Sequence, residues 1–178
     1  KVAAHEGCTG FERGRSITTH AALHAGSAVL VRMDLKDFFP STSEARVRQY
    51  FRKIGWSKPA ADELVRLCCY GGGLPQGAPT SPRLSSVVNF GMDAALARAA
   101  EKRGARYSRY ADDLAFSFSI DDAVQVRTLI GIVRWILRKN GYRVNGKKRI
   151  RILRRHQRQI VTGLVINDDV HLHRVERR

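Results

Sequence analysis

Apolar residues recur along the chain at the periods of strands and helices. A continuous apolar run at 28–33 predicts a strand that places Asp34 at its C-terminal end, where ligand sites of mixed α/β sheets tend to lie. Apolar positions at helical spacing predict four helices, at 43–54, 60–70, about 82–102 and about 122–140. Shorter apolar runs predict strands near 149–153 and 159–166.

Turn and cap residues mark the ends of these elements. The segment 71–82, GGGLPQGAPTSP, must be a loop, and Ser81 followed by Pro82 suits the start of the next helix. Alternating residues on both sides of 111–113 predict a hairpin with two acids at its tip. The other predicted helix ends are Ser41 or Ser43, Asp121 and Gly141. This order predicts an α+β fold with helices on one face of an antiparallel sheet.

Composition favours one domain with a polyanionic partner. The chain has 178 residues, 43% of them hydrophobic, and its 32 Lys and Arg against 16 Asp and Glu give a net charge of +16. A net positive charge can also serve only to keep a protein in solution, so the charge alone does not identify the reaction that the protein catalyses. No apolar run approaches a membrane span, and the cysteines and histidines lack disulfide or zinc spacing. We therefore expect a cytoplasmic protein with no membrane partner.

Three aspartates stand at predicted strand ends: Asp34 after the first strand, and Asp112 and Asp113 on the hairpin. Neighbouring strands lie only about 5 Å apart, so these acids could converge. Phosphoryl transfer uses divalent ions held by carboxylates and by substrate phosphates. An Asp-Asp pair in a loop is more often a solvated turn, however, so the acids alone leave both interpretations open.

The surroundings of these acids resemble the reverse transcriptases. YADD at 110–113 resembles their YxDD box, RMDLKDFF at 32–39 their first carboxylate motif, and LPQGAPTSP at 74–82 the nucleotide-contacting loop between the two. GFERGRS at 10–16 is similar to a fingers segment, and GYRVNGKKRI at 141–150 to the fourth palm motif. HAALH at 20–24 resembles the retron NAxxH element, with His20 in place of Asn, and VTG at 161–163 resembles the retron triplet. The resemblance covers essentially the whole chain and is most specific to the retron type.

The resemblance implies a role for each matched residue. The metal ligands it implies for two Mg²⁺ ions, or Mn²⁺ in their place, are Asp34, Asp112, Asp113 and the carbonyl of Leu35. The nucleotide-binding residues it implies are Arg15, Asp37, Phe38, Phe39, Gln76 and Gly77. Phe39 would exclude the 2′-hydroxyl, and Lys148 would donate a proton to pyrophosphate, although Lys147 suits that role equally well.

Structural interpretations compete with several of these roles. Phe38 and Phe39 could be core aromatics, and Arg15 could be a solvated surface charge. The run Lys147, Lys148 and Arg149 could be a solvated face. The favoured roles of His20 and His24 are packing and hydrogen bonding, not catalysis.

The fold that the resemblance implies is a polymerase palm at 28–178, with primer-grip strands, preceded by a partial fingers segment at 1–27 and with no counterpart of the thumb. We expect the full enzyme to be longer. The implied function is RNA-directed DNA polymerase activity on an RNA template and primer, using dNTPs, a cognate noncoding RNA and an effector protein in antiphage defence. The alternatives are a polymerase of the same fold that acts on DNA or without a template, and a nucleic-acid-binding module with a weak or degenerate centre.

Overall fold

A computed structural model gives the structure of the chain and describes residues 3–146 and 150–172. Its centre is a four-stranded antiparallel sheet in the order β2-β3-β1-β4. The strands are β1 (Val29–Asp34), β2 (Ala105–Tyr110), β3 (Asp113–Phe118) and β4 (Arg151–Arg154). The predicted α+β class, with its antiparallel sheet and its acids at strand ends, is confirmed.

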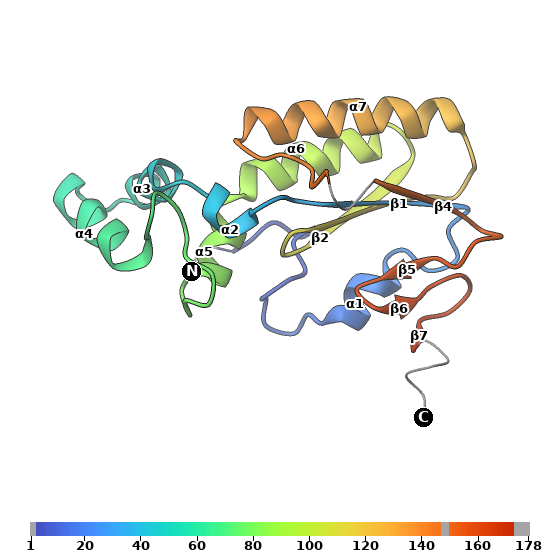
Figure 1. The fold of residues 1–178 in the computed structure, drawn as a ribbon, viewed down its shortest axis with the longest axis horizontal. Coiled ribbons are helices and arrows are strands. Elements are labelled where there is room, and N and C mark those ends of the chain that lie inside the picture. The colour runs from blue at the N-terminus through green and yellow to red at the C-terminus, as the bar shows by residue number, and fades with distance from the viewer. Residues whose placement is uncertain (1–2, 147–149, 173–178) are drawn as a thin grey trace.

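Two long helices cover one face of this sheet, α6 (Phe90–Glu101) and α7 (Ala123–Lys139), as Figure 1 shows. Alternate residues of β1 point toward them, so Val29, Val31 and Met33 enter the main core. Leu129 and Val133 of α7 meet them from the helix side, as the helical spacing predicted. None of the helices in the described part of the chain is long and apolar enough to cross a membrane.

A second layer covers the other face of the sheet. It consists of α1 (Ile17–Ala22) and a small sheet of β5 (Ile160–Val161), β6 (Leu164–Val165) and β7 (His171–Leu172). Leu30 and Ala115 of the central sheet pack here against Val161 and Ile166. Because both faces are covered, the first half of β1 is apolar on both sides, and Val29, Leu30 and Val31 form a continuous apolar run in the sequence.

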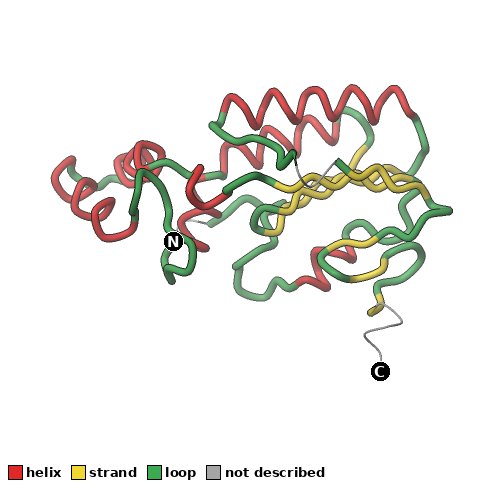
Figure 2. Tube along the Cα trace, viewed as in Figure 1, coloured by secondary structure: helices red, strands yellow, loops and turns green. Residues whose placement is uncertain are grey.

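Short helices lie beyond one end of the sheet, at the left of Figures 1 and 2. They are α2 (Phe38–Ser41), α3 (Glu44–Lys53), α4 (Lys58–Cys68) and α5 (Ser81–Val88). Val47, Ala61 and Leu74 form a core of their own between them. This core supports the predicted 71–82 loop, which joins α4 to α5.

The predicted helix at 82–102 is wrong in one respect, because it is divided at Asn89 into α5 and α6. The Asn89 backbone leaves the helical region at ψ 5°, and its side-chain amide donates to the Ser85 carbonyl at 2.8 Å and to the Tyr142 hydroxyl at 2.9 Å. Asparagine competes in this way for helix hydrogen bonds. The break turns α6 to lie along the sheet (Figure 1).

Three other predicted boundaries were wrong by small amounts. The 159–166 strand is a hairpin, because Thr162 and Gly163 have left-handed φ values of 47° and 86° and form the turn. Asp122, not Asp121, caps α7, since its carboxylate accepts from the backbone N–H groups at 124 and 125. Ser81 lies inside α5, and its hydroxyl donates to the Pro75 carbonyl.

Candidate active site

The central sheet brings the three predicted aspartates to one edge. Asp34 ends β1 and Asp113 begins β3, and the two are direct partners in the antiparallel register. Asp112 lies on the two-residue turn between β2 and β3. The Leu35 N–H donates to the Asp112 carbonyl at 2.9 Å, which fixes the turn beside the end of β1. Residues 79 positions apart in the sequence therefore meet because β1 pairs with β3.

A hollow of about 270 Å³ opens at this edge. The predicted site residues that line it are Asp34, Leu35, Asp37, Phe38, Phe39, Gln76 and Asp112. Pro40 and Asn145 complete the lining. The three motifs that contain the lining residues of the prediction are thus brought together by the fold.

Asn145 is a site residue whose role the sequence did not predict. Its side-chain amide donates to the Asp34 Oδ1 at 3.0 Å, and its backbone N–H donates to the Asp34 carbonyl at 2.8 Å. The segment reaches Asp34 because Lys36 N–H donates to the Arg143 carbonyl. Asn145 thereby orients the Asp34 carboxylate. The resemblance at 141–150 located it, but only the structure reveals its acceptor.

Asp113 is placed differently from the other two acids. Its carboxylate forms an ion pair with Arg32, whose Nη1 also donates to the Ile160 carbonyl at 2.9 Å. Burial raises the pKa of Asp113, the Arg32 cation lowers it, and the negative charges of Asp112 and Asp34 raise it further, so the net shift is upward. Asp113 therefore belongs electrostatically to the cluster, although it does not line the hollow.

The hollow has the donors that a hard divalent ion needs, but not a complete cage. Among the described residues no group of three acid, histidine or cysteine side chains could hold a metal ion by itself. Asp34 and Asp112 supply two carboxylates, and the Leu35 carbonyl at the hollow accepts no hydrogen bond from the described residues. Mg²⁺ is commonly held by one or two carboxylates together with substrate phosphates. The residues present fit such an ion.

The start of α2 supplies unpaired donors to the same hollow. Asp37 adopts the left-handed conformation, with φ 46° and ψ 49°, and α2 begins immediately after it. The N–H groups of Asp37, Phe38 and Phe39 donate to no acceptor in the part of the chain that the structure describes. Donors at a helix start suit anionic oxygen atoms. These N–H groups are therefore available for the predicted contacts to a triphosphate.

The two phenylalanines of this segment differ in their surroundings. Phe38 is 5% exposed, belongs to the main core and stacks on Tyr142, with ring centroids 5.5 Å apart. Phe39 is half-buried, and its ring lies 6.2 Å from that of Phe11, which lies 6.0 Å from that of Tyr110. Phe11 has a left-handed φ of 62°, which is unusual for a bulky residue. Nothing in the sequence pattern indicated that Phe11 joins this aromatic wall.

Besides Asp113, two predicted site residues, Arg15 and Gly77, do not line the hollow. Arg15 donates instead to the backbone carbonyls of Glu6 and Cys8. Gly77 lies exposed in the loop with φ 88°, so its conformation alone favours glycine. Lys148, like Lys147, lies outside the described residues.

Two buried histidines underlie the hairpin. His24 is hydrogen-bonded to the hydroxyls of Ser117 at 2.7 Å and Ser108 at 2.6 Å, and His20 Nδ1 lies 2.9 Å from the same Ser108 hydroxyl. Burial lowers the pKa of His20 to about 4 and that of His24 to about 3. The His20 ring is 5.8 Å from that of Tyr110. Both histidines are thus neutral structural residues beneath the turn that carries Asp112.

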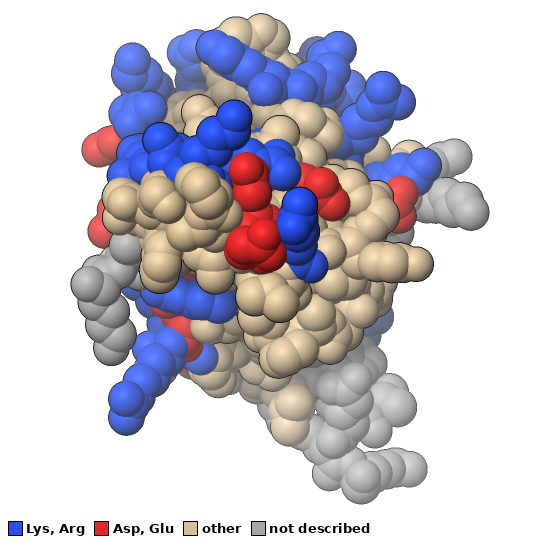
Figure 3. Space-filling view, turned by 90° about the vertical axis from the view of Figure 1, so that its left-hand side faces the viewer, with Lys and Arg blue, Asp and Glu red and all other residues tan. Residues whose placement is uncertain are grey.

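Positive charge covers much of one end of the molecule. Figure 3 views the end of the molecule from the side of α3 and α4, and Lys and Arg side chains spread over much of this face. The Asp and Glu side chains form small groups, the largest of them near the middle of this face (Figure 3). A net charge of +16 spread in this way favours a polyanion over any small anion.

Comparison with known proteins agrees with this geometry. The profile of the family described as "Reverse transcriptase (RNA-dependent DNA polymerase)" matches residues 2–162. The retron Mx65 reverse transcriptase of Myxococcus xanthus is 38% identical over 94% of this chain and 43% of its own length. The retron Ec86 reverse transcriptase of Escherichia coli is 37% identical over 90% of this chain and 49% of its own. The chain thus spans less than half the length of these relatives.

The fold also resembles a solved polymerase. The structure of apo telomerase from Candida tropicalis, truncated from the C-terminal domain, superposes with a TM-score of 0.61 over 82% of this chain and 35% of that one. Sequence identity is 15%, so this likeness concerns the fold alone.

Proposed function

Because the chain belongs to the reverse transcriptase family, and to its retron type by similarity to the two retron enzymes, we propose that it is the catalytic part of an RNA-directed DNA polymerase. The enzyme would extend a primer with deoxynucleotides on an RNA template. The observation that carries the proposal is the convergence of Asp34 and Asp112, from separate motifs, in one hollow beside unpaired backbone donors.

In this proposal Asp34, Asp112 and the Leu35 carbonyl hold the divalent ions, of which Mg²⁺ fits best. Such ions, when bound, lower the pKa of a primer hydroxyl and neutralise the charge of leaving pyrophosphate. Asn145 keeps the Asp34 carboxylate in one orientation. Asp113, paired with Arg32, adds negative charge to the cluster without lining the hollow, and we retain it as a supporting acid.

The same geometry supports a place for the incoming nucleotide. The N–H groups at the start of α2 would bind its phosphates, and Gln76 also lines the hollow. Phe39 would lie against the sugar, because its ring is half-exposed and supported by Phe11 and Phe38. Arg15 and Gly77 stay predicted contacts, since neither lines the hollow.

The partners follow from the same proposal. An RNA template and primer fit the net charge of +16, and the similarity to retron enzymes supports a cognate noncoding RNA as the template. A role in antiphage defence with an effector protein rests on the family resemblance alone. The palm would comprise 28–178, and the segment before it would belong to the fingers.

Primer extension with defined templates tests the proposal. The protein should incorporate dNTPs on an RNA template in the presence of Mg²⁺, and Asp34→Asn or Asp112→Asn should lower kcat by several orders of magnitude, because each removes a charge without changing shape. RNA affinity should change little. Incorporation only on DNA, or without any template, would favour the alternative polymerase.

Asp62→Asn is the matched control. Asp62 lies on α4 in an ion pair with Arg48, outside the hollow, so its replacement makes the same chemical change without touching the site. It should leave kcat within about twofold, as expected for a surface ion pair worth under about 1 kcal/mol. Near-normal synthesis by Asp112→Asn with Mg²⁺ would refute the assignment.

A further inference from the structure

The turn that carries Asp112 is conformationally demanding. Ala111, its first residue, has a left-handed φ of 53°, although alanine has neither the freedom of glycine nor a side chain that stabilises this region. A strained residue of this kind keeps its conformation only when its surroundings impose it. The position of Asp112 therefore depends on what holds Ala111.

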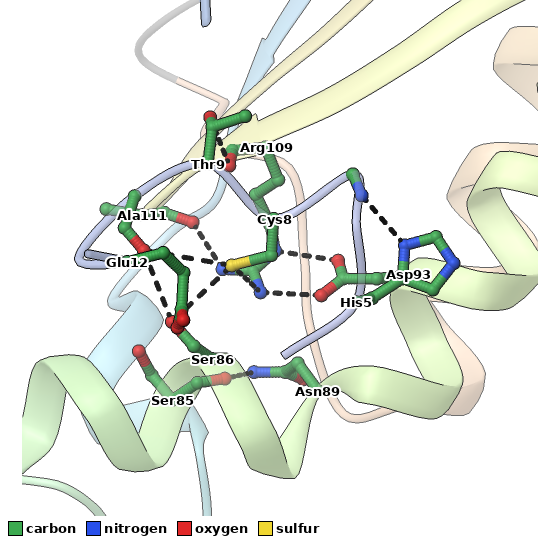
Figure 4. Close-up of polar contacts among 12 residues, drawn as sticks. His5, Cys8, Thr9, Glu12, Ser85, Ser86, Asn89, Asp93, Arg109 and Ala111 are labelled. Carbon is green, nitrogen blue, oxygen red and sulfur yellow. Dashed lines mark hydrogen bonds and ion pairs between the residues drawn. The ribbon is translucent and has the colours of Figure 1, made fainter. Parts of the chain in front are cut away.

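A buried guanidinium holds the carbonyl side of this turn. Arg109 Nη1 donates to the Ala111 carbonyl at 3.0 Å (Figure 4). The same guanidinium binds Asp93 of α6 through two hydrogen bonds, from Nε at 2.8 Å and from Nη2 at 2.7 Å. Both side chains of this pair are 0% exposed. The Tyr107 hydroxyl also donates to Asp93, at 2.7 Å, so the carboxylate is held in place.

Residues 7–10, near the N-terminus, pack against the backbone nitrogen of Ala111 on the other side of the turn. Residues 7–10 run along β2, where the Arg109 N–H donates to the Gly7 carbonyl and the Thr9 N–H donates to the Arg109 carbonyl, both at 2.8 Å. Cys8 Sγ accepts from Arg109 Nη2 at 3.3 Å. A Cβ added to Gly10 would lie 2.7 Å from the Ala111 nitrogen, so backbone packs directly on backbone.

This arrangement exceeds what stability requires. Replacing a buried ion pair by well-packed apolar residues is often neutral or stabilising, so stability alone does not account for Arg109 and Asp93. The guanidinium also lies 5.2 Å over the ring of Phe38, which lines the hollow. One side chain thus connects the turn, α6 and a wall of the site.

We propose that Arg109 is a positioning residue: held by Asp93 and backed by Gly10, it sets the place of Asp112 in the metal-binding hollow. This rests on the proposed function of that hollow. Arg109 touches no reacting atom, and it acts through the backbone of Ala111. The chain therefore uses a rigid support from α6 and residues 7–10, not the turn's own preference, to hold its second carboxylate.

Gly10→Ala tests the proposal without changing any charge. The added methyl meets the Ala111 backbone and must displace the turn, and a misplacement of about 1 Å can cost on the order of a hundredfold in rate. We expect kcat to fall at least about tenfold and the Mg²⁺ concentration for half-maximal rate to rise several-fold. Gly91→Ala is the matched control, since a Cβ there meets nothing within 4 Å. It should change neither quantity.

Direct metal binding separates this proposal from the proposed function. Mn²⁺ affinity, followed by the electron paramagnetic resonance of the free ion, should weaken in Gly10→Ala and in Arg109→Lys, with Asp112→Asn marking loss of the site. A purely structural role would lower the amount of folded protein, seen in a melting curve, but leave the affinity of the folded fraction unchanged. Unchanged Mn²⁺ affinity in folded Gly10→Ala would overturn the proposal. Absence of synthesis by the unaltered protein would instead refute the polymerase function.

Discussion

Acidification should destabilise the protein through two buried histidines, His20 and His24. Both are fully buried in the described structure, and hydroxyls of Thr9 and Ser108 lie 2.8 and 2.9 Å from His20 Nδ1. His20 Nε2 is buried with no partner, and Arg32 further opposes a positive charge on this ring. A proton added to either ring would place a cation where none of the carboxylates in the described residues pairs with it.

The size of the effect follows from the two pKa values. They are lowered from 6.5 to about 4 for His20 and about 3 for His24, so the unfolded chain binds protons that the folded protein refuses. The neutral histidines therefore leave the free energy of unfolding at its full value above about pH 6.5, and this free energy falls as the pH falls toward 4 for His20 and 3 for His24. At pH 5 each histidine lowers the free energy of unfolding by about 2 kcal/mol, and the pair lowers it by about 4 kcal/mol. The total free energy of unfolding of a typical domain is roughly 5–15 kcal/mol.

Urea unfolding at about pH 7.5, 6 and 5 measures this directly. Between pH 6 and 5 the two histidines together should lower the free energy of unfolding by about 2 kcal/mol, and His20→Gln/His24→Gln should lose most of this pH dependence. His156→Gln, in an exposed turn, is the control and should keep the wild-type slope. Comparing slopes removes the contribution of the carboxylates, which all three proteins share. A double variant that keeps the full slope would refute the reasoning.

Two further predictions concern substrate and RNA. Phe39→Val should raise ribonucleotide use relative to deoxynucleotide use by about tenfold, or roughly 1.4 kcal/mol, because the half-buried ring limits the space for a 2′-hydroxyl. The control is Phe51→Val, in the core between the short helices, which should lower the melting temperature without changing the ratio of the two kcat/KM values. An unchanged ratio in Phe39→Val would refute the exclusion of the 2′-hydroxyl by Phe39. The logarithm of the RNA binding constant should fall linearly with the logarithm of the salt concentration, because a protein of net charge +16 releases counterions when it neutralises RNA phosphates. A binding constant that does not change with salt would refute phosphate binding.

Much of the fold was predictable because its strongest signals are local. The apolar run of β1 and the helical spacing of α7 follow from burial, which both elements share along their whole length. The hairpin was predictable because alternation on both sides of 111–112 requires a turn between them. The break at Asn89 was not, because it depends on a hydrogen bond to Tyr142, 53 residues away in the sequence.

The candidate site was predictable only through its motifs. Nothing local distinguishes Asp112 from Asp113, two identical residues side by side. The structure separates them because Arg32, two residues before Asp34 in β1, lies where it can bind Asp113. A pairing of this kind depends on the register of β1 and β3, which the sequence pattern does not specify to one residue. The resemblance already included all three acids, but the separate environment of Asp113 needed the structure.

The buried ion pair of Asp93 and Arg109 was also not predictable from the sequence pattern. Asp93 in a helix and Arg109 in a strand each have the appearance of a solvated charge, since charged residues are rarely buried completely. Their burial follows from the break at Asn89, which begins α6 so that Asp93 faces β2. The same unpredicted break thus creates the support under Ala111. A residue that looked like surface becomes part of the active-site scaffold because of a helix end four residues before it.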